Sequence, residues 1–427
     1  MYNLKKDLDK YSYLNIQDIE NKTIIVRSCL NVAVDKEGRM EDSTRFYESL
    51  PLIKELAEKA KKVIVMGHLG RPERRDKSLS FWNIAEVLTT ELEEQRVEVE
   101  LVDSLGKIGK KETHNPETHN LDTHNLDTHN LETHNYASVK AQRKKIILID
   151  NIRFFPGEES KNKDVRMAFA KELASLADVF VNDAFADYRE SASTYDIATL
   201  LPSYLGPVFM KEVAALSKFS QPESPFVAVL GGAKLSEKLD ALNALVQIAD
   251  KVIIGGAMAY TIMKAIGVET GNSLIEKDKL EIATEIMNKY SEKILLPVDH
   301  LVAQEFKLKS PYEYTETEVV PADMVAIDIG WNSIRKFKTE ISNSKSILWN
   351  GPMGVFEWIH SSVGTKEIGS AIAENTSAYS LAGGGDSIAA INKFNLRGFD
   401  HVSTGGGAML AFLAYDKFPT LDVILNK

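Results

Sequence analysis

The sequence predicts an α/β protein made of two doubly wound parallel-sheet domains that are joined by a helix. Three observations lead to this fold class. Short apolar runs alternate with longer segments of helical periodicity from one end of the chain to the other. The chain has 427 residues, which is too long for one ordinary core. A stretch with several proline and glycine breaks interrupts the alternation at 201–225.

The strands follow from the apolar runs, because parallel strands that are covered on both faces are continuously apolar. In the first half we expect strands near 23–30, 62–68, 97–102, 145–151, 179–184 and 226–232. In the second half we expect them near 251–256, 294–302, 324–330, 346–351, 379–384 and 401–404. Helical periodicity fills most of the gaps, as in 45–60, 81–94 and 363–373.

The interrupted stretch sets the domain boundary. Proline and glycine break the chain before 208, a helical segment follows, and two further prolines end that segment before 226. A short helix is also expected in the tail from about Phe412. We therefore expect an N-terminal domain at 1–206, a connecting helix that serves as a hinge at 207–220, a C-terminal domain at 221–411 and a tail at 412–427.

Composition and charge argue against several classes of function. The formal net charge is −10 and the pI is near 5.5, which argues against nucleic acid or an anionic membrane as the main partner. Cys29 is the single cysteine, so no intrachain disulfide can form and a reducing compartment fits. The sequence has neither a signal peptide nor the roughly 20 apolar residues of a membrane span. We expect a cytoplasmic monomer that binds small molecules.

One segment does not fit the alternation of strands and helices. At 112–136 a pentapeptide recurs as ETHNP, ETHNL, DTHNL, DTHNL and ETHNY. A period of five residues fits neither helix nor strand, and one apolar residue per repeat cannot build a core. We interpret the segment as a solvated, mobile insert that the fold tolerates. Loose binding of transition metals by its histidines is the alternative.

The stretch FVAVLGGAKLSEKLDAL at 226–242 predicts a buried strand, a tight glycine turn and a helix that starts near Lys234. Lys234 and Lys238 would then lie on one face of the first helical turns. Two cations at the positive end of a helix dipole favour a bound anion. The pattern therefore indicates a polyphosphate site, with a solvated basic edge as the alternative. It is not a Walker loop, because GxxxxGK[ST] does not occur in the sequence.

Basic and amide side chains follow the predicted strands of the first half. Since ligands of open α/β sheets bind beyond the carboxyl ends of the strands, these groups can converge on a small molecule with phosphate and carboxylate groups. Taken singly, each arginine is a candidate for a surface salt bridge. The residues are Arg27, Asn31, Arg45, His68, Arg71, Arg153 and Arg189.

Glycine-rich turns follow the strands of the second half, in GGAK, IIGGAMAY, WNGPMGVFE, LAGGGDS and STGGGA. Glycines at such positions let backbone N–H groups line a nucleotide. Asp386 follows three glycines, so it is either a helix cap or a carboxylate that holds Mg²⁺ directly or through water. Glu357 is placed to accept hydrogen bonds from ribose hydroxyls.

A set of sequence blocks resembles the phosphoglycerate kinase family. They occur in the order of that family over almost the whole chain, as VRSCLNV, DSTRF, GHLGRP, DNIRF, VNDAF, LGGAKLSEK, LLPVD, WNGPMGVFE, GGGDS and HVSTGGGA. The resemblance implies two Rossmann-like domains, with the tail returning to the first. It also implies Mg²⁺-dependent transfer of the acyl phosphate of 1,3-bisphosphoglycerate to ADP, which gives 3-phosphoglycerate and ATP.

The resemblance also implies roles for individual residues. It assigns the triose to Arg27, Asn31, His68, Arg71, Arg153 and Arg189. It assigns the transferring phosphoryl group to Arg45 and Lys234, with Lys238 on the nucleotide phosphates and Asp386 on the metal. The remaining nucleotide-site positions are Gly232, Ala233, Gly255, Asn350, Pro352, Val355, Glu357, Gly385 and Ser387. We further expect the two sites to face one another across a cleft that closes about 201–217 and Thr404.

The chain departs from the family pattern on the triose side. Cys29 stands where the family usually has aspartate, and Ala33 stands where it has proline. Near Arg189, Tyr188 and Ser191 stand where histidines are usual, and the loop is one residue shorter. Drift within a working enzyme explains these changes. A paralogue that acts on another acyl phosphate, or a weakly active nucleotide-binding scaffold, is the alternative.

Overall fold

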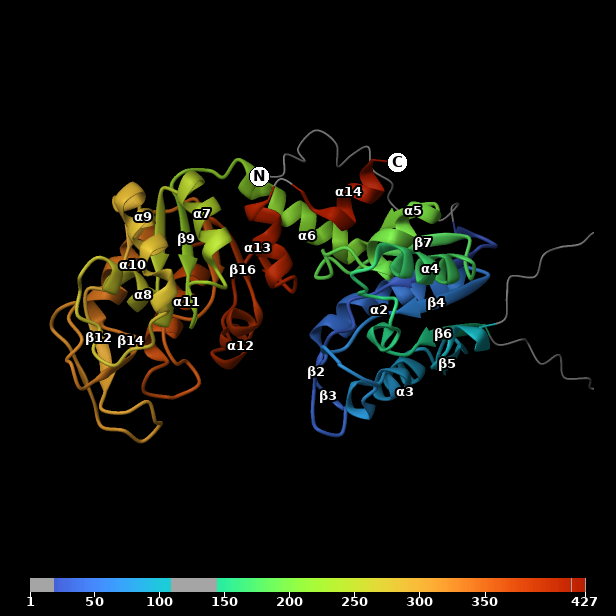
Figure 1. Ribbon diagram of the computed structural model, residues 1–427, viewed down its shortest axis with the longest axis horizontal. Coiled ribbons are helices and arrows are strands. Elements are labelled where there is room, and N and C mark those ends of the chain that lie inside the picture. Colours follow the sequence, from blue (N-terminus) through green and yellow to red (C-terminus); the bar gives the residue numbers. More distant parts are fainter. Residues whose placement is uncertain (1–18, 109–143, 416, 427) are drawn as a thin grey trace, which may run out of the picture. The chain divides into compact units, whose positions relative to one another are not determined.

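The computed structural model describes residues 19–108, 144–415 and 417–426, which form two compact units (Figure 1). The N-terminal unit contains the described residues up to 183 and those of 190–206. The C-terminal unit contains 184–189 and the described residues from 207 onward. The domain limits expected from the sequence stay a prediction. Within the described ranges, no helix is long and apolar enough to cross a membrane.

The N-terminal unit is built on a parallel sheet of order β5-β6-β4-β1-β7-β8. Its carboxyl strand ends therefore share one edge, which is the edge where the basic side chains follow. A short antiparallel pair, β2 (Ala33–Val34) and β3 (Met40–Asp42), lies outside this sheet. The strands are β1 (Thr23–Arg27), β4 (Lys62–Met66), β5 (Glu98–Val102), β6 (Lys145–Ile149), β7 (Val179–Asn182) and β8 (Ser203–Leu205).

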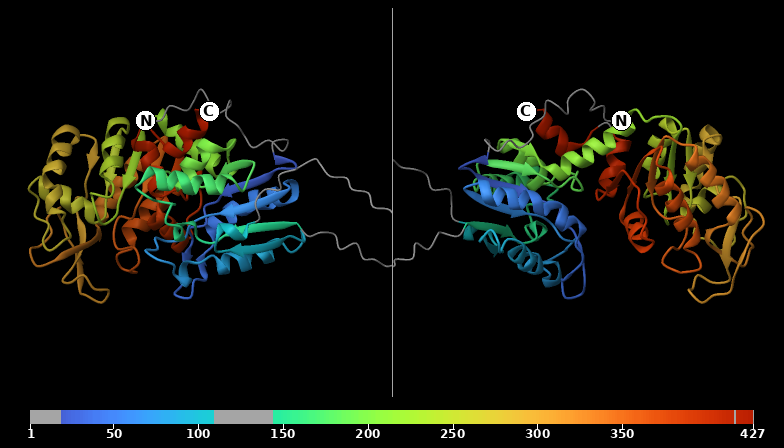
Figure 2. Two further views of the ribbon diagram at one scale, coloured as in Figure 1. Left: turned by 45° about the vertical axis from the view of Figure 1, so that its right-hand side comes forward. Right: turned by 180° about the vertical axis from the view of Figure 1, so that it is seen from behind.

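Helices flank this sheet (Figures 1 and 2). Ile24 and Val26 belong to a core cluster with Phe46 and Leu88, whereas Ile25 is buried outside that cluster. This division follows from the strand period, because successive side chains point to opposite faces. The helices are α2 (Thr44–Lys59), α3 (Trp82–Glu91), α4 (Lys163–Ala174) and α5 (Ile197–Leu200).

The C-terminal unit repeats this architecture with the strand order β11-β10-β9-β15-β16-β17, all pairs being parallel. Its central strand β9 is buried along its whole length, as the apolar run predicts. The strands are β9 (Phe226–Leu230), β10 (Lys251–Ile254), β11 (Ile294–Leu295), β15 (Ser346–Asn350), β16 (Tyr379–Gly383) and β17 (His401–Ser403).

A second, antiparallel sheet of order β13-β12-β14 belongs to the same unit. It comprises β12 (His300–Ala303), β13 (Tyr312–Tyr314) and β14 (Val325–Ile329). The helices of the unit are α6 (Pro207–Ser217), α7 (Leu239–Ile248), α8 (Ala257–Ala265), α9 (Leu280–Tyr290), α10 (Trp331–Ser342), α11 (Val363–Glu374), α12 (Gly385–Lys393), α13 (Gly407–Ala414) and α14 (Pro419–Leu425).

The single strand predicted at 294–302 is wrong, because this stretch forms β11 and β12 in different sheets. Pro297 lies between them and has no N–H for a sheet ladder. The backbone N–H groups of Val298 and Asp299 instead donate to the Ser333 hydroxyl, at 2.8 and 3.2 Å. The strand predicted at 324–330 likewise forms in the antiparallel sheet.

The tail helix begins at Pro419 rather than near Phe412, which lies in α13. Proline suits the first position of a helix, where its missing N–H has no partner to lose. Phe418 is fully buried and stacks on Phe185 at 5.0 Å between ring centroids. Its ring also contacts Phe412 and Phe209 at 5.5 and 6.2 Å. The tail is thus anchored on α6, α13 and the segment 184–189, all of which belong to the same unit as the tail, and its expected return to the first domain stays a prediction.

The pentapeptide insert at 112–136 lies outside the described residues. We expect its deletion to leave enzymatic activity unchanged and to change the free energy of unfolding by only about 1 kcal/mol, because loop closure entropy grows slowly with loop length. Chemical denaturation of the full chain and of the deletion variant measures this difference. Loss of soluble protein on deletion would show that the repeats pack or bind something.

Candidate active site

Arg27 ends β1 and is only 2% exposed. Its Nε donates to the Ser193 hydroxyl at 3.0 Å, and its NH1 group donates to the Ser28 carbonyl at 3.2 Å. Its NH2 group lies 3.1 Å from Nδ1 of the buried His68. Because a guanidinium only donates, Nδ1 of His68 accepts this bond and the ring proton lies on Nε2.

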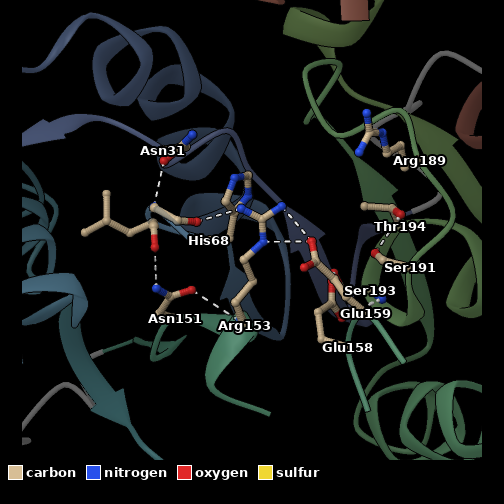
Figure 3. A network of polar contacts seen from close by, with 12 residues as sticks. Asn31, His68, Asn151, Arg153, Glu158, Glu159, Arg189, Ser191, Ser193 and Thr194 are labelled. Atoms are coloured by element: carbon tan, nitrogen blue, oxygen red, sulfur yellow. Dashed lines mark hydrogen bonds and ion pairs between the residues drawn. The ribbon is translucent and has the colours of Figure 1, made fainter. Parts of the chain in front are cut away.

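The loop after β4 brings further predicted residues to the same edge (Figure 3). Asn31 Oδ1 accepts a hydrogen bond from the Gly70 N–H at 2.9 Å, and Arg153 NH1 donates to the Gly70 carbonyl at 2.6 Å. Asn151, which follows β6, donates to the Leu69 carbonyl at 2.7 Å. The strand ends of β1, β4 and β6 are therefore tied together by side chains that bind one loop.

Arg45 lies in the first turn of α2, where its charge opposes the helix dipole and where no acidic residue is present. Its NH1 group donates to the Asn31 carbonyl at 2.7 Å. The side chain is half-buried and reaches the cluster of Arg27, Asn31, His68 and Arg153. This contact accounts for a cation at an otherwise unfavourable position.

The structure does not bring all the predicted triose residues into this network. Arg71 is exposed. Arg189 is exposed in the segment 184–189, which belongs to the C-terminal unit, and its guanidinium lies 5.6 Å from the centroid of the Tyr188 ring. Arg153 itself forms an ion pair with Glu159 at 2.6 Å, so a bound anion would compete with that carboxylate.

The glycine turns of the C-terminal unit approach one another closely at the carboxyl ends of the strands. A Cβ atom on Gly231 would lie 2.0 Å from the Pro352 carbonyl oxygen, and one on Gly256 would lie 2.5 Å from the Gly232 nitrogen. The φ angle of Gly232 is +124°, which is unfavourable for other residues. Glycine is thus required here for backbone contact, as the sequence pattern predicts.

The helix predicted to start near Lys234 begins instead at Leu239. Ser236 explains the difference, because its N–H donates to the Glu276 carboxylate at 3.0 Å and its hydroxyl bonds the same group. These bonds hold a turn at 236–238 that precedes the helix. Lys234 and Lys238 consequently do not share a helix face. The Lys234 side chain is 57% exposed and lies 3.7 Å from Glu237.

Lys238 is directed inward. Its ammonium donates to the side-chain oxygen of Asn350, whose Nδ2 donates to the Gly383 carbonyl at 2.7 Å. The Ser387 hydroxyl binds the neighbouring Gly351 N–H at 2.7 Å. Burial lowers the pKa of Lys238 to about 8, although the Asp386 and Glu237 charges oppose the shift. An anion near this ammonium would stabilise its charged form.

If Lys238 binds the nucleotide phosphates, as the resemblance implies, its lowered pKa predicts that nucleotide affinity falls above pH 8. The ammonium is charged below its folded-state pKa and is lost as pH rises through it, so the ADP dissociation constant should rise by at most about tenfold per pH unit. Between the folded-state pKa of Lys238 and its higher pKa in the unfolded chain, the unfolded chain binds more protons than the folded protein does. The free energy of unfolding measured without nucleotide therefore rises with pH over this range. Calorimetric titration with ADP from pH 7 to 9.5 measures the affinity. Lys238→Arg should remove the decline, and a decline that persists in this variant would contradict the assignment.

A cavity of about 690 Å³ lies beside these turns. Predicted residues on its lining are Gly232, Ala233, Pro352, Val355, Glu357 and Asp386. The other predicted residues are not on this lining: Gly255 follows β10, Asn350 ends β15, and Gly385 and Ser387 lie in the first turn of α12. Sequence reasoning missed its apolar wall, which includes Tyr260, Leu274, Phe306, Ile327 and Trp358. Phe306 is 61% exposed and packs against Trp358 with ring centroids 4.9 Å apart. These side chains give the cavity a surface suited to a planar ring.

Asp328 is a further lining residue that sequence reasoning missed. Asp328 is an acidic residue in the otherwise apolar strand β14. This exception to the apolar pattern could have identified it from the sequence. Its carboxylate accepts hydrogen bonds from the N–H groups of Gly364 and Ile329 at 2.8 and 2.9 Å. Burial raises the pKa of Asp328 to about 8, and these N–H groups oppose the rise.

Asp386 lies in the first turn of α12 and is exposed at the cavity. Within the described ranges, no three His, Cys, Asp or Glu side chains converge to hold a metal ion by themselves. This donor set still fits Mg²⁺, which usually keeps several waters and takes one or two carboxylates together with substrate phosphates.

Comparison with known proteins assigns the chain to a family. The family model described as phosphoglycerate kinase matches residues 14–415. The chain belongs to the phosphoglycerate kinase family. It is therefore a phosphotransferase that uses ATP and ADP as co-substrates.

Two curated relatives agree with this assignment over nearly their whole length. A phosphoglycerate kinase of Dictyoglomus turgidum is 38% identical, over 97% of this chain and 98% of the relative. One of Thermosipho africanus is 40% identical, over 96% of each chain. The solved phosphoglycerate kinase of Coxiella burnetii gives a TM-score of 0.77 at 33% identity, over 96% of this chain and 97% of that one. The solved phosphoglycerate kinase of Pyrococcus horikoshii gives a TM-score of 0.76 at 29% sequence identity. The match covers 99% of this chain and 98% of that one. These neighbours confirm the predicted fold class.

Three of the departures from the phosphoglycerate kinase pattern occupy packed or partly packed positions, whereas the fourth, Ala33, is exposed at the start of β2. Cys29 and Ser191 are buried, and the Ser191 hydroxyl lies 2.9 Å from that of Thr194. The Tyr188 ring stacks on Phe418 at 5.6 Å. Cys29, Ser191 and Tyr188 thus contribute to the interior of their units.

Proposed function

We propose that the chain catalyses reversible transfer of the acyl phosphate of 1,3-bisphosphoglycerate to ADP, which yields 3-phosphoglycerate and ATP. One structural observation supports this proposal independently of family membership. Arg27, Asn31, Arg45, His68 and Arg153 gather at one edge of the N-terminal sheet through direct contacts and the loop after β4. The three arginines carry a fixed positive charge and donate hydrogen bonds, and the Asn31 amide and the His68 ring also have N–H groups that can donate. Such a group suits a small molecule with several anionic oxygens.

Each side chain has a role in this reaction. Arg27, His68, Arg71, Arg153 and Arg189 bind the phosphate and carboxylate oxygens of the triose, with Asn31 orienting its polar groups. Arg45 neutralises charge on the transferring phosphoryl group from the triose side, and Lys234 does so from the nucleotide side. The nucleophile in the ATP-forming direction is an ADP phosphate oxygen, and in the reverse direction it is the triose carboxylate. No protein base is therefore required, and positioning with charge neutralisation supplies the catalysis.

The nucleotide lies along the glycine turns of the C-terminal unit in this proposal. Its base enters the apolar part of the cavity, Glu357 accepts hydrogen bonds from the ribose, and Lys238 contacts the phosphates. Backbone N–H groups near Gly232, Gly385 and Ser387 complete the phosphate site. Asp386 would hold Mg²⁺, which neutralises phosphate charge when bound. The negative net charge supports small molecules, rather than nucleic acid or membranes, as partners of a cytoplasmic monomer.

A coupled assay tests the proposed function. Purified protein receives 3-phosphoglycerate, ATP and Mg²⁺, and ADP formation is followed with and without each component. We expect turnover that requires all three. Turnover with acetate or another carboxylate in place of 3-phosphoglycerate would indicate a paralogue with a different substrate. Binding of ADP with no turnover on any carboxylate would indicate a scaffold.

The chemistry also predicts a change of overall size when both substrates bind. An acyl phosphate that is open to water hydrolyses, so transfer requires a closed, drier state. We expect a hinge rotation about 201–217 and Thr404, partial with either substrate and complete with both. Small-angle scattering of the empty, singly liganded and doubly liganded protein measures it. The same radius of gyration in all three states would contradict the hinge.

A further inference from the structure

Glu158 is a buried carboxylate to which the proposed reaction assigns no part. The Ser193 hydroxyl donates to its Oε1 at 2.6 Å, and the Ser193 N–H donates to its Oε2 at 3.1 Å (Figure 3). In addition, the Glu158 carbonyl accepts from the Ala192 N–H at 3.0 Å. Glu158 is therefore fixed to the start of the π-helical turn Ala192–Asp196 by both its backbone and its side chain.

Ser193 connects this carboxylate to Arg27. A serine hydroxyl has one proton and two lone pairs. Since the proton points to Glu158, a lone pair remains to accept the Arg27 Nε–H at 3.0 Å. A hydroxyl that donates to a carboxylate becomes a better acceptor, so the two bonds strengthen one another. The direction of each bond is thus determined, and the chain Glu158–Ser193–Arg27 has one arrangement.

Charge supports the same connection. Arg27 and Glu158 are both about fully buried, and a buried guanidinium without a counter-charge is strongly unfavourable. Burial raises the pKa of Glu158, and the Arg27 charge and the Ser193 donors oppose that rise. The carboxylate and the guanidinium therefore stabilise one another across the serine.

We propose that Glu158 is a positioning residue for Arg27, which acts through Ser193 to fix the guanidinium plane at the carboxyl end of β1, where the triose anion binds. This proposal rests on the proposed function, because it assigns the triose to that edge. It differs from a general packing role of the turn. A packing role lowers stability when it is removed, whereas a positioning role weakens triose binding selectively.

Ser193→Ala tests the proposal with little perturbation, because it removes one hydroxyl and leaves the carboxylate in place. We expect the KM for 3-phosphoglycerate to rise about tenfold, as is typical for the loss of a hydrogen bond to a charged group, while the KM for ATP changes by less than about twofold. Glu158→Gln should raise the same KM to a similar extent. If Glu158→Gln does not give folded protein, a triose KM near that of the parent in Ser193→Ala still overturns the proposal.

Asp196→Asn is the matched control. Asp196 ends the same turn, is buried, and pairs with Arg166 at 2.5 Å rather than with Arg27. We expect this variant to lose stability in chemical denaturation while it keeps the triose KM of the parent.

Each result has a defined meaning. A triose KM within about twofold of the parent in Ser193→Ala would overturn the proposal, and so would an equal rise in Asp196→Asn. A rise in Ser193→Ala without one in Glu158→Gln would assign the role to Ser193 alone. Absence of turnover in the parent protein would instead contradict the proposed function.

Discussion

Arg45→Ala is expected to lower kcat about 100- to 1000-fold, the loss typical of a preorganised group that stabilises transition-state charge. Arg45 is held before substrate arrives, because its NH1 group already donates to the Asn31 carbonyl at 2.7 Å. In the proposed arrangement its charge therefore faces the reacting oxygens with little reorganisation. The affinity for ATP should change by less than about threefold, since ATP contacts the other unit in the proposed arrangement.

Steady-state kinetics with both substrates and calorimetric titration with ATP separate these effects. Arg39→Ala is the control, because the Arg39 side chain is exposed and its guanidinium lies 3.8 Å from the carboxylate of the nearby surface residue Asp35. A kcat of Arg45→Ala near that of the parent would contradict the role of Arg45 at the transferring phosphoryl group. An equal loss of kcat in Arg39→Ala would show that any positive charge in this region supports turnover, and that Arg45 has no specific role.

Lys234→Ala is expected to lose about 100-fold in kcat and also to bind ATP more weakly, because the proposed function places Lys234 against the phosphoryl group on the nucleotide side. The Lys234 side chain is more than half exposed, and its ammonium lies 3.7 Å from the Glu237 carboxylate. It thus keeps its reach toward a nucleotide phosphate, while the neighbouring Lys238 is bound to Asn350.

Lys264→Ala is a matched control for this variant. Lys264 is a partly exposed lysine of the same unit that also pairs with a glutamate, Glu269, at 3.2 Å. We expect its kcat and ATP affinity to equal those of the parent. Normal turnover in Lys234→Ala, measured beside this control, would remove Lys234 from the reaction.

Much of the fold could be predicted, because the apolar runs are easy to recognise and glycine or polar residues regularly end them. Strands such as β1, β9 and β15 are buried on both faces, so nearly every residue of each run must be apolar. The close backbone approach after β9 and β15 could also be predicted, because glycines follow both apolar runs. In the structure a Cβ atom at these glycines would collide with neighbouring backbone. The arginines at the strand ends were found by the same logic, since parallel strands place their carboxyl ends at one edge.

Other features depend on partners that are distant in sequence. The helix expected at Lys234 is replaced by turns because Glu276, 40 residues away from Ser236, binds that serine. The aromatic wall of the cavity was missed because Phe306 and Trp358 come from segments with no shared pattern. Glu158 and Ser193 were missed for a similar reason, because neither lies in a recognisable block and 35 residues separate them.

The sequence by itself determined the fold class, the family and the types of side chain at the two strand edges, because apolar periodicity and glycine turns are local properties. Only the tertiary structure decided which of those side chains meet. It joined Arg45 to Asn31, turned Lys238 inward, left Arg71 exposed and placed Arg189 in the other unit. The physical reason is that burial and hydrogen-bond partners depend on how separate segments pack, and a charged side chain takes its direction from these contacts rather than from its neighbours in the chain.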